Sequence, residues 1–280
     1  MGKKHSHSKT YYNDIALKLA HRVLGIEHLH YGYFLPGQKA VLENLPRAQA
    51  QYVKNLLSFI PKKGIKHIFD VGCGTGGVAT ELLKKKMQLT CLAPDPYLIT
   101  KTKENTKNRV ETITDLYENV EGPSGLYDMI LMSESCQYVK IKEGWEQHSK
   151  FLRPGGYVLI ADFFRIRELD QPYLSKSGHP LKEFIETAEN LGFSLIKKQD
   201  ITKFVAPTMT IYQNLITGKI FPVIEAIFEF TARKFPRFYK IMRKFLKNKV
   251  LFLKTKYENQ GPDIFKKYKS YQVLLFQKKS

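Results

Sequence analysis

The sequence predicts an α/β fold built on a mostly parallel sheet. Short apolar runs typical of buried strands alternate with runs of helical period from about residue 61 onward, which is the pattern of βαβ units. The first of these strands ends directly in a glycine-rich turn that opens a helix. The last one follows only after a long helical stretch. Seven strands are predicted, over residues 66–71, 87–93, 110–113, 127–132, 156–161, 193–199 and 271–277.

The length of 280 residues suits one large domain that carries an insertion. Residues 1–10 are polar and basic and are expected to form a flexible leader, and helical patterns over 11–60 predict an N-terminal lid. The core is expected over 61–203, a helical insertion or cap over 204–268, and the last core strand over 269–280.

Charge is the unusual global feature, because 45 Lys and Arg residues face 26 Asp and Glu, giving a net charge of +19. Such an excess indicates an anionic partner: nucleic acid, anionic lipid or a phosphorylated substrate. No apolar stretch approaches the roughly 20 residues of a spanning helix, and the N-terminus has no secretory signal. Cys73, Cys91 and Cys136 lie in apolar contexts without paired spacing, which favours a reduced, cytoplasmic protein.

The glycine-rich turn is the most informative motif. Gly72, Gly74 and Gly76 follow the strand 66–71, and glycines there allow a tight turn and a close approach of the backbone to a ligand. Asp95 lies 23 residues after Gly72, at the end of the next strand. That spacing is close to the one at which a carboxylate accepts hydrogen bonds from ribose hydroxyls.

Spacing alone does not exclude a nicotinamide dinucleotide, because Gly77 supplies the third glycine of that fingerprint. Asp70 decides the choice. It stands two residues before the first glycine, where a carboxylate would meet a cationic ligand and would repel a pyrophosphate.

The run Asp70-Val-Gly-Cys-Gly-Thr-Gly76 resembles motif I of the class I S-adenosylmethionine-dependent methyltransferases. The resemblance implies a seven-stranded, mostly parallel Rossmann-like sheet with helices on both faces, an N-terminal helical lid and a helical insertion before the last strand. Further segments that carry it are Asp95, 114–116, 127–134 and 152–160.

The resemblance also implies the cofactor, which is S-adenosyl-L-methionine with S-adenosyl-L-homocysteine as the product, and no metal. Asp95 would hold the ribose, and Asp115 would flank the adenine. The implied cofactor-binding residues are Asp70, Gly72, Cys73, Gly74, Gly76, Asp95, Pro96, Asp115, Leu116, Ser133, Tyr31 and Tyr33.

The acceptor is indicated less directly. The segment 133–138 lacks the Pro-Pro-Tyr of amino-adenine methylases, and Cys136 lacks the preceding proline of cytosine enzymes. It is more similar to the branch that methylates quinones, tocopherols and sterols. The segment 28–34 resembles the His-x-Gly-Tyr element of tocopherol- and sterol-type enzymes, which folds over the cofactor.

By that resemblance, His28 or His30 is a candidate general base, with a hydrogen-bonded loop residue as the alternative. Glu134 is a candidate catalytic residue, or else a structural anion that bonds the N-terminal lid. Gln137 and Tyr138 are the candidate substrate contacts.

The insertion contains a basic amphipathic helix over 235–249. Such a helix can lie on an anionic membrane, pack its apolar side on the domain, or contact nucleic acid, and these alternatives stay open. The insertion as a whole is expected to roof an apolar acceptor pocket.

These observations favour an enzyme that transfers a methyl group directly, by SN2 displacement, to a small and relatively apolar acceptor such as a lipid, quinone or polyketide. The alternatives are an RNA-modifying methyltransferase, favoured only by net charge, and a catalytically silent partner subunit with the same fold. Nucleic acid is the less favoured partner.

Overall fold

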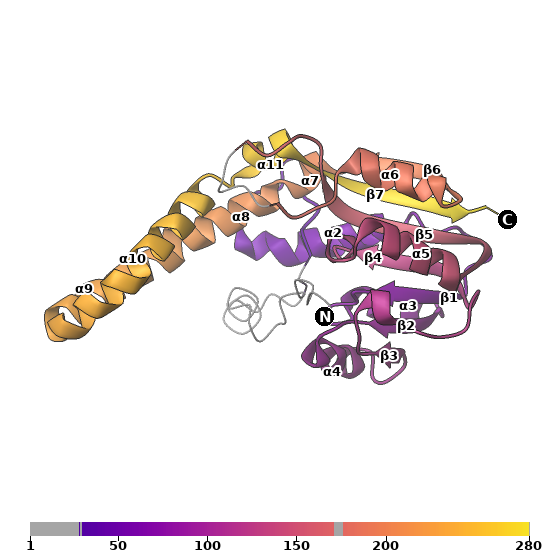
Figure 1. Cartoon of the computed structure of the whole chain (residues 1–280), viewed down its shortest axis with the longest axis horizontal. Helices are drawn as coiled ribbons and strands as arrows, with labels where there is room; N and C mark the ends of the chain where they lie inside the picture. The colour runs from indigo at the N-terminus through magenta and orange to yellow at the C-terminus, as the bar shows by residue number, and fades with distance from the viewer. Residues whose placement is uncertain (1–27, 29, 171–175, 280) are drawn as a thin grey trace, which may run out of the picture.

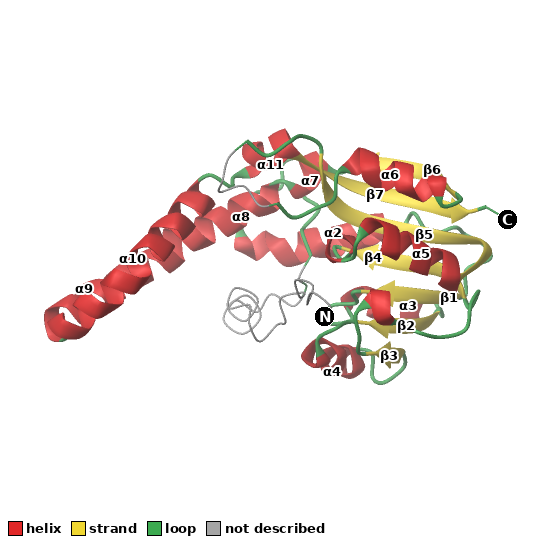
Figure 2. Ribbon diagram, in the orientation of Figure 1, coloured by secondary structure: helices red, strands yellow, loops and turns green. Residues whose placement is uncertain are grey.

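The computed structural model describes residues 28, 30–170 and 176–279, and its core is a seven-stranded sheet (Figures 1 and 2). The strand order is β3-β2-β1-β4-β5-β7-β6, with β7 antiparallel to both of its neighbours and the others parallel. The strands are β1 (His67–Val71), β2 (Gln88–Leu92), β3 (Glu111–Ile113), β4 (Tyr127–Ser133), β5 (Leu152–Arg165), β6 (Phe193–Asp200) and β7 (Lys269–Lys278).

The predicted fold class is therefore confirmed, and all seven strands lie where the apolar runs placed them. The largest difference is in β5, which begins at Leu152 and ends at Arg165 where 156–161 was predicted. It is longer because β7 pairs with it from Tyr157 to Arg165, so the partner strand extends the ladder beyond the apolar run.

Helices cover both faces of the sheet. Ile68 and Phe69 are consecutive in β1, and each is fully buried in a different apolar cluster, one on each face. The first face is covered by α2 (Leu45–Leu57), α3 (Gly77–Lys84), α4 (Pro96–Asn105), α7 (Thr202–Val205) and α11 (Pro262–Tyr268). The second is covered by α5 (Ile141–Phe151) and α6 (Leu181–Asn190). Short 3-10 turns lie at η1 (Leu42–Asn44), η2 (Tyr117–Asn119) and η3 (Cys136–Tyr138).

The N-terminal lid is only partly described. The leader 1–10 and most of the helical pattern that precedes Leu45 lie outside the described residues. Within the helical patterns predicted over 11–60, the structure describes α2, which begins at Leu45 and ends at Leu57. It can begin there because Pro46 lies in its first turn, where the missing N–H costs nothing.

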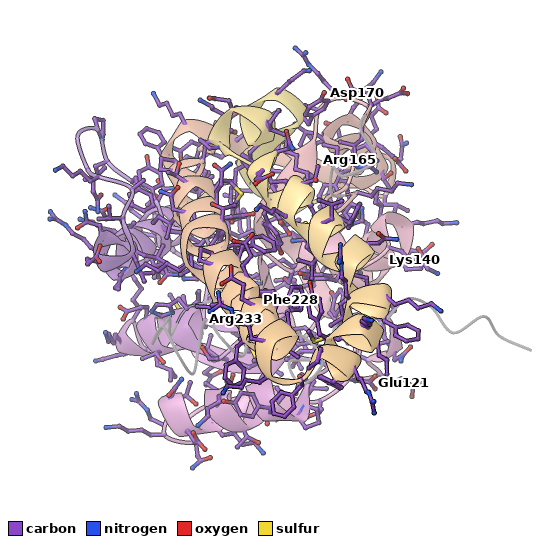
Figure 3. The ribbon with its side chains drawn as sticks, turned by 90° about the vertical axis from the view of Figure 1, so that its left-hand side faces the viewer. Glu121, Lys140, Arg165, Asp170, Phe228 and Arg233 are labelled. Atoms are coloured by element: carbon purple, nitrogen blue, oxygen red, sulfur yellow. The ribbon has the colours of Figure 1, made fainter. Side chains whose placement is uncertain are left out.

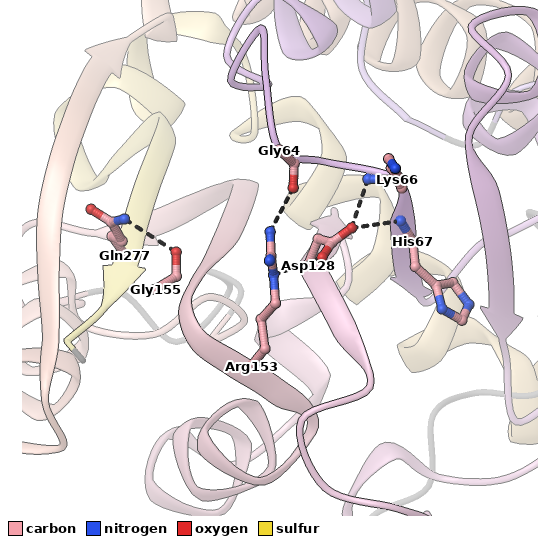
Figure 4. A network of polar contacts seen from close by, with 7 residues as sticks. All are labelled: Gly64, Lys66, His67, Asp128, Arg153, Gly155 and Gln277. Atoms are coloured by element: carbon pink, nitrogen blue, oxygen red, sulfur yellow. Dashed lines mark hydrogen bonds and ion pairs between the residues drawn. The ribbon is translucent and has the colours of Figure 1, made fainter.

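A polar network ties the amino ends of β1 and β4 to the amino end of β5 (Figure 4). Asp128 accepts hydrogen bonds from the backbone N–H groups of Lys66, at 2.7 Å, and His67, at 2.9 Å. Arg153 forms an ion pair with Asp128 at 2.7 Å and donates to the carbonyl of Gly64 at 2.6 Å. The network leaves the opposite, carboxyl edge of the sheet free for a site.

The insertion consists of two parts. Its first part, α8 (Pro207–Leu215), follows α7 and packs against α11 and the segment around Tyr31. After a π-helical turn η4 (Ile216–Ile220), α9 (Phe221–Lys234) and α10 (Pro236–Glu258) form a hairpin that points away from the sheet (Figure 1).

This arrangement corrects two expectations. Within the described part of the chain, α7, α8 and α11 lie against the core or one another, whereas the hairpin projects beyond it (Figure 1). The basic helix 235–249 lies within α10 and packs on α9 and η4, not on the sheet. Among the described residues, no helix is both long and apolar enough to cross a bilayer.

We expect Asp128→Ala to lower the free energy of unfolding by about 1–3 kcal/mol, because two backbone donors and Arg153 lose their acceptor. Urea unfolding measures this. The control is Asp263→Ala, which removes an ion pair whose carboxylate is 91% exposed and should change stability by less than about 0.5 kcal/mol. Equal effects of the two substitutions would contradict the network's role.

Candidate active site

The glycine-rich turn lies at the carboxyl end of β1, between β2 and β4. Gly72, Gly74 and Gly76 all have positive φ angles, of 81°, 58° and 83°. At Gly72 a Cβ would lie only 2.3 Å from the Cβ of Ser135, so a side chain there would need the segment after β4 to move. Strand order reverses between β1 and β4, and in open α/β sheets ligands bind at such a point.

Backbone bonds hold this turn against β2 and α4. The N–H groups of Gly72 and Cys73 both donate to the carbonyl of Leu92, at 2.8 and 3.0 Å. The Thr102 hydroxyl donates to the carbonyl of Gly74 at 3.2 Å, and its Oγ1 lies 3.5 Å from the thiol of Cys73. The turn is thus fixed in shape, and the Cys73 thiol faces α4.

Asp70 is a buried acid without a counter-ion in the structure. Its side chain is 1% exposed, and its Oδ2 has no hydrogen-bond partner among the described residues. Burial raises the pKa of this carboxyl to about 7. A cationic group of a ligand bound at the glycine turn would supply the hydrogen bond and the counter-charge that this buried carboxylate lacks.

The predicted ribose and adenine residues follow β2 and β3. Asp95 is 2% exposed and caps α4, because its Oδ1 accepts from the N–H of Tyr97 at 2.8 Å, with Pro96 as the first residue of the helix. Asp115 accepts from the N–H of Leu116 at 2.7 Å, and the Leu116 side chain is 41% exposed. An exposed leucine beside this edge could lie against a flat ring.

Tyr31 brings the N-terminal segment onto the carboxyl edge of the sheet. Its N–H donates to Oε1 of Glu134 at 2.7 Å, and its ring lies among four other aromatic rings. The centroid separations range from 5.6 Å to 6.3 Å. These rings belong to Phe163, Tyr212, Phe265 and Tyr271, from β5, α8, α11 and β7.

Glu134 lies at the centre of a polar chain. Its Oε1 accepts a hydrogen bond from the Tyr271 hydroxyl at 2.7 Å, and the Tyr271 hydroxyl lies 3.0 Å from the Tyr52 hydroxyl. The Tyr52 hydroxyl in turn lies 2.9 Å from Oγ of Ser133. Burial raises the pKa of Glu134 to about 8. The backbone of Glu134 has a left-handed φ of 58°. Residues other than glycine rarely adopt this conformation, and those that do cluster at functional sites.

The two candidate histidines lie beside the glycine turn. The His28 ring lies against Gly77, where an added Cβ would be 2.4 Å from its Nδ1, and stacks on His30 with centroids 5.1 Å apart. His30 in turn stacks on Tyr52, and its Nδ1 is 2.9 Å from the carbonyl of Tyr31. Its Nε2 is buried and has no hydrogen-bond partner among the described residues.

Burial lowers the pKa of His30 to about 4, so it is neutral at pH 7. A general base works best with a pKa near the operating pH, which makes His30 a weak candidate for that role. Its contacts fit the alternative, a hydrogen-bonded loop residue.

The remaining predicted residues lie around this edge, but not all of them point inward. Tyr33 stacks on Phe204 of α7 at 4.4 Å, so it fixes the lid to the insertion. Gln137 donates from its backbone and its amide to Asp162, both at 3.3 Å. Tyr138 is 65% exposed.

Sequence reasoning missed three residues that build the site: Tyr52, Asp162 and Tyr271. Tyr52 lies on one face of an amphipathic helix, and Tyr271 lies in an apolar strand, so each has the pattern of an ordinary core residue. Asp162 could have been found from the sequence, because it is an acid that directly follows the apolar run 156–161. It is fully buried, and burial raises its pKa to about 6.

The fold and this edge define a class of protein. The sheet order, the glycine turn after β1, the acid at the carboxyl end of β1 and the acid after β2 resemble those of the Rossmann-like, class I methyltransferases. Residues 68–156 match the family described as "Methyltransferase domain". Residues 68–156 of the core thus match a methyltransferase domain, and the resemblance seen in the sequence is confirmed.

Curated relatives act on small molecules, by their names. The chain is 24% identical over 208 residues to norajmaline N-methyltransferase of Rauvolfia serpentina, covering 70% of this chain and 71% of that protein. It is 23% identical over 212 residues to a probable chloroplastic tocopherol O-methyltransferase of Oryza sativa subsp. japonica, covering 65% of this chain and 58% of that protein.

Solved structures show the same fold at low identity. The [4+2]-cyclase SpnF matches with a TM-score of 0.67 and 16% identity, over 96% of this chain and 94% of its own. Geranyl diphosphate C-methyltransferase of Streptomyces coelicolor A3(2), in complex with Mg²⁺, geranyl diphosphate and S-adenosyl-L-homocysteine, matches with a TM-score of 0.64 and 15% identity, over 96% and 95%. In the described part of this chain, no three His, Cys, Asp or Glu side chains gather so that they could hold a metal.

Asp70→Asn should change how the ligand-free protein responds to pH. The folded pKa of about 7 lies above the value of about 3.9 expected unfolded, so the carboxyl contributes stability that is present below pH 4 and lost as the pH rises toward 7. The loss approaches about 1.4 kcal/mol per pH unit. Asn has no proton to lose, so the variant should exceed the wild type in stability at pH 8 by at least about 1 kcal/mol.

Urea unfolding at pH 5 and pH 8 measures the effect. Asp115→Asn is the matched control, because that side chain is partly exposed and hydrogen-bonded to Leu116. If wild type and Asp70→Asn lose stability in parallel between the two pH values, Asp70 is not the buried acid described here.

Proposed function

We propose that the protein is an S-adenosylmethionine-dependent methyltransferase that acts on a small, relatively apolar acceptor. The observation that carries the proposal is Asp70, a carboxylate with an unpartnered buried oxygen next to an open glycine turn. S-adenosylmethionine bears a positive sulfonium and an ammonium group, so its amino acid part supplies the missing counter-charge.

The residues present fit this cofactor. Gly72 and Gly74 would let the backbone approach the amino acid part, Asp95 would accept from the ribose hydroxyls, and Leu116 with Asp115 would flank the adenine. When bound, the cofactor supplies a methyl group already activated by the sulfonium. The remaining tasks of the chain are to bind the acceptor, orient it and exclude water.

The aromatic cluster around Tyr31 suits those tasks. Its rings come from β5, β7, the insertion and the N-terminal segment, and they lie beside Glu134 at the end of β4. An apolar, aromatic wall beside the carboxyl groups of Glu134 and Asp162 favours an apolar acceptor with a polar reacting group. The names of the relatives, which concern an alkaloid and a tocopherol, support a small molecule of this kind.

Glu134 has two proposed roles in this reaction. Its pKa of about 8 is close enough to neutrality for a general base that takes a proton from the acceptor. Its bonds to the N–H of Tyr31 and to the hydroxyl of Tyr271 support the other role, an anchor for the lid.

A label-transfer assay tests the function. The protein is incubated with methyl-labelled S-adenosylmethionine and a whole-cell extract of its host, and organic, aqueous and RNA fractions are counted. Label in the organic fraction is expected. Asp95→Asn should weaken cofactor binding, measured by calorimetry, at least about tenfold, because it loses a charged acceptor worth about 1.4 kcal/mol or more.

Asparagine at position 95 can still cap α4, so folding is the internal control. Label in RNA would replace the small-molecule acceptor with RNA. Tight cofactor binding without any transfer would favour a silent partner subunit or a chemistry other than methyl transfer, as the fold of the SpnF cyclase shows can exist.

Glu134→Gln separates the two roles of that residue. The amide oxygen of Gln can accept the same two hydrogen bonds, so an anchor should retain activity within about threefold. A general base should lose roughly 10²–10⁴-fold in kcat. Tyr271→Phe is the companion variant: it removes one bond of the anchor and leaves the carboxylate in place.

A further inference from the structure

The hairpin of α9 and α10 exposes an unusual amount of apolar surface. The two helices pack on each other, with Phe228 and Met242 half-buried, and the pair extends from the core (Figures 1 and 3). Nine other apolar side chains of the hairpin are more than half exposed. They are Val223, Ile227, Phe230, Phe235, Phe238, Ile241, Phe245, Leu251 and Phe252.

These exposed side chains form stripes along each helix. Residues three, four or seven apart lie on one side of an α-helix. The stripe of α9 is Val223, Ile227 and Phe230, and the stripe of α10 is Phe238, Ile241, Phe245 and Phe252.

The ion pair between Lys254 and Glu225, at 3.0 Å, shows that the two stripes share one face of the hairpin. Glu225 is two residues from Val223, and Lys254 is two residues from Phe252, so each lies about 200° round its helix from the stripe. Because the ion pair joins the helices on one face, both stripes lie on the opposite face. The hairpin therefore has a single continuous apolar face, defined by the seven residues of the two stripes.

The same segment is strongly basic. Residues 230–257 contain no Asp or Glu. Their Lys and Arg residues are Arg233, Lys234, Arg237, Lys240, Arg243, Lys244, Lys247, Lys249, Lys254 and Lys256. Lys249 lies one turn from both Phe245 and Phe252, and Lys234 one turn from Phe230, so cations border the apolar face.

We propose that this apolar face docks on the surface of an anionic lipid bilayer. Aliphatic and aromatic side chains would enter the boundary between headgroups and acyl chains, while the bordering lysines would contact anionic headgroups. Pairing of two copies through this face would bring two strongly basic segments together. RNA would match the charge, but it offers no apolar surface for Val223, Ile227 and Ile241. The inference goes beyond the proposed methyl transfer and is independent of it.

Vesicle flotation tests the proposal with the full chain. The vesicles are phosphatidylcholine alone, and phosphatidylcholine with about a third phosphatidylglycerol. We expect at least about tenfold stronger binding to the anionic vesicles, reduced by 0.5 M NaCl, because each surface cation contributes to attraction that salt screens. Absence of binding to anionic vesicles, or equal binding to both kinds, would overturn the proposal.

Two variants and their controls locate the surface. Phe238→Ser with Phe245→Ser removes apolar contacts, and Lys234→Glu with Lys249→Glu reverses the bordering charge. Each should reduce binding at least tenfold. The matched controls are Leu126→Ser with Ile196→Ser, both exposed on the core, and Lys62→Glu with Lys63→Glu.

The controls should bind as the wild type does. If the controls lose as much vesicle binding as the variants, binding depends on net charge or general hydrophobicity, and the assignment to this face is wrong. Sedimentation velocity without lipid is run in parallel. A dimer that the Phe238→Ser, Phe245→Ser variant dissociates would make the face a contact between copies and contradict the proposal. Binding of RNA through this face, without binding to anionic vesicles, would contradict it as well.

Discussion

The carboxylate of Glu134 joins three parts of the chain that lie far apart in the sequence. It follows β4, and its Oε1 receives the N–H of Tyr31 from the N-terminal segment and the hydroxyl of Tyr271 from the last strand. Its left-handed φ is held by a backbone bond from its own N–H to the carbonyl of Ala161, at 2.8 Å. The N-terminal segment, the end of β4 and the last strand are held together at this one group.

Acids whose pKa values are raised by desolvation recur along the same edge of the sheet. Asp70, Glu134 and Asp162 have pKa values raised to about 7, 8 and 6, in each case mainly because burial disfavours the charged form. Such groups lower the stability of the folded chain near neutral pH. A fold retains them where a ligand or a reaction uses the charge, and for Asp70 the proposed use is a cationic cofactor.

The two ends of the molecule differ in what they present to the surroundings. The core encloses its apolar residues on both faces of the sheet, whereas the hairpin leaves one apolar face uncovered and surrounds it with cations. The high net charge of the chain is therefore unevenly placed, since residues 230–257 hold ten of its 45 Lys and Arg and no acid. If the proposed docking holds, an apolar acceptor could be collected at the membrane surface by the same molecule that methylates it.

The features that the sequence determined by itself are those that depend on residues close together along the chain. The strands follow from short apolar runs, and the turn follows from Gly72, Gly74 and Gly76. The proposal of a cationic ligand follows from Asp70, two residues before that turn, and each of these inferences depends on neighbours along the chain. Only the tertiary structure decided that Glu134 binds Tyr31 and Tyr271, across 103 and 137 residues, and that the hairpin stands clear of the core. Periodicity shows that a helix has an apolar side, but what covers that side depends on long-range packing, which local pattern does not encode.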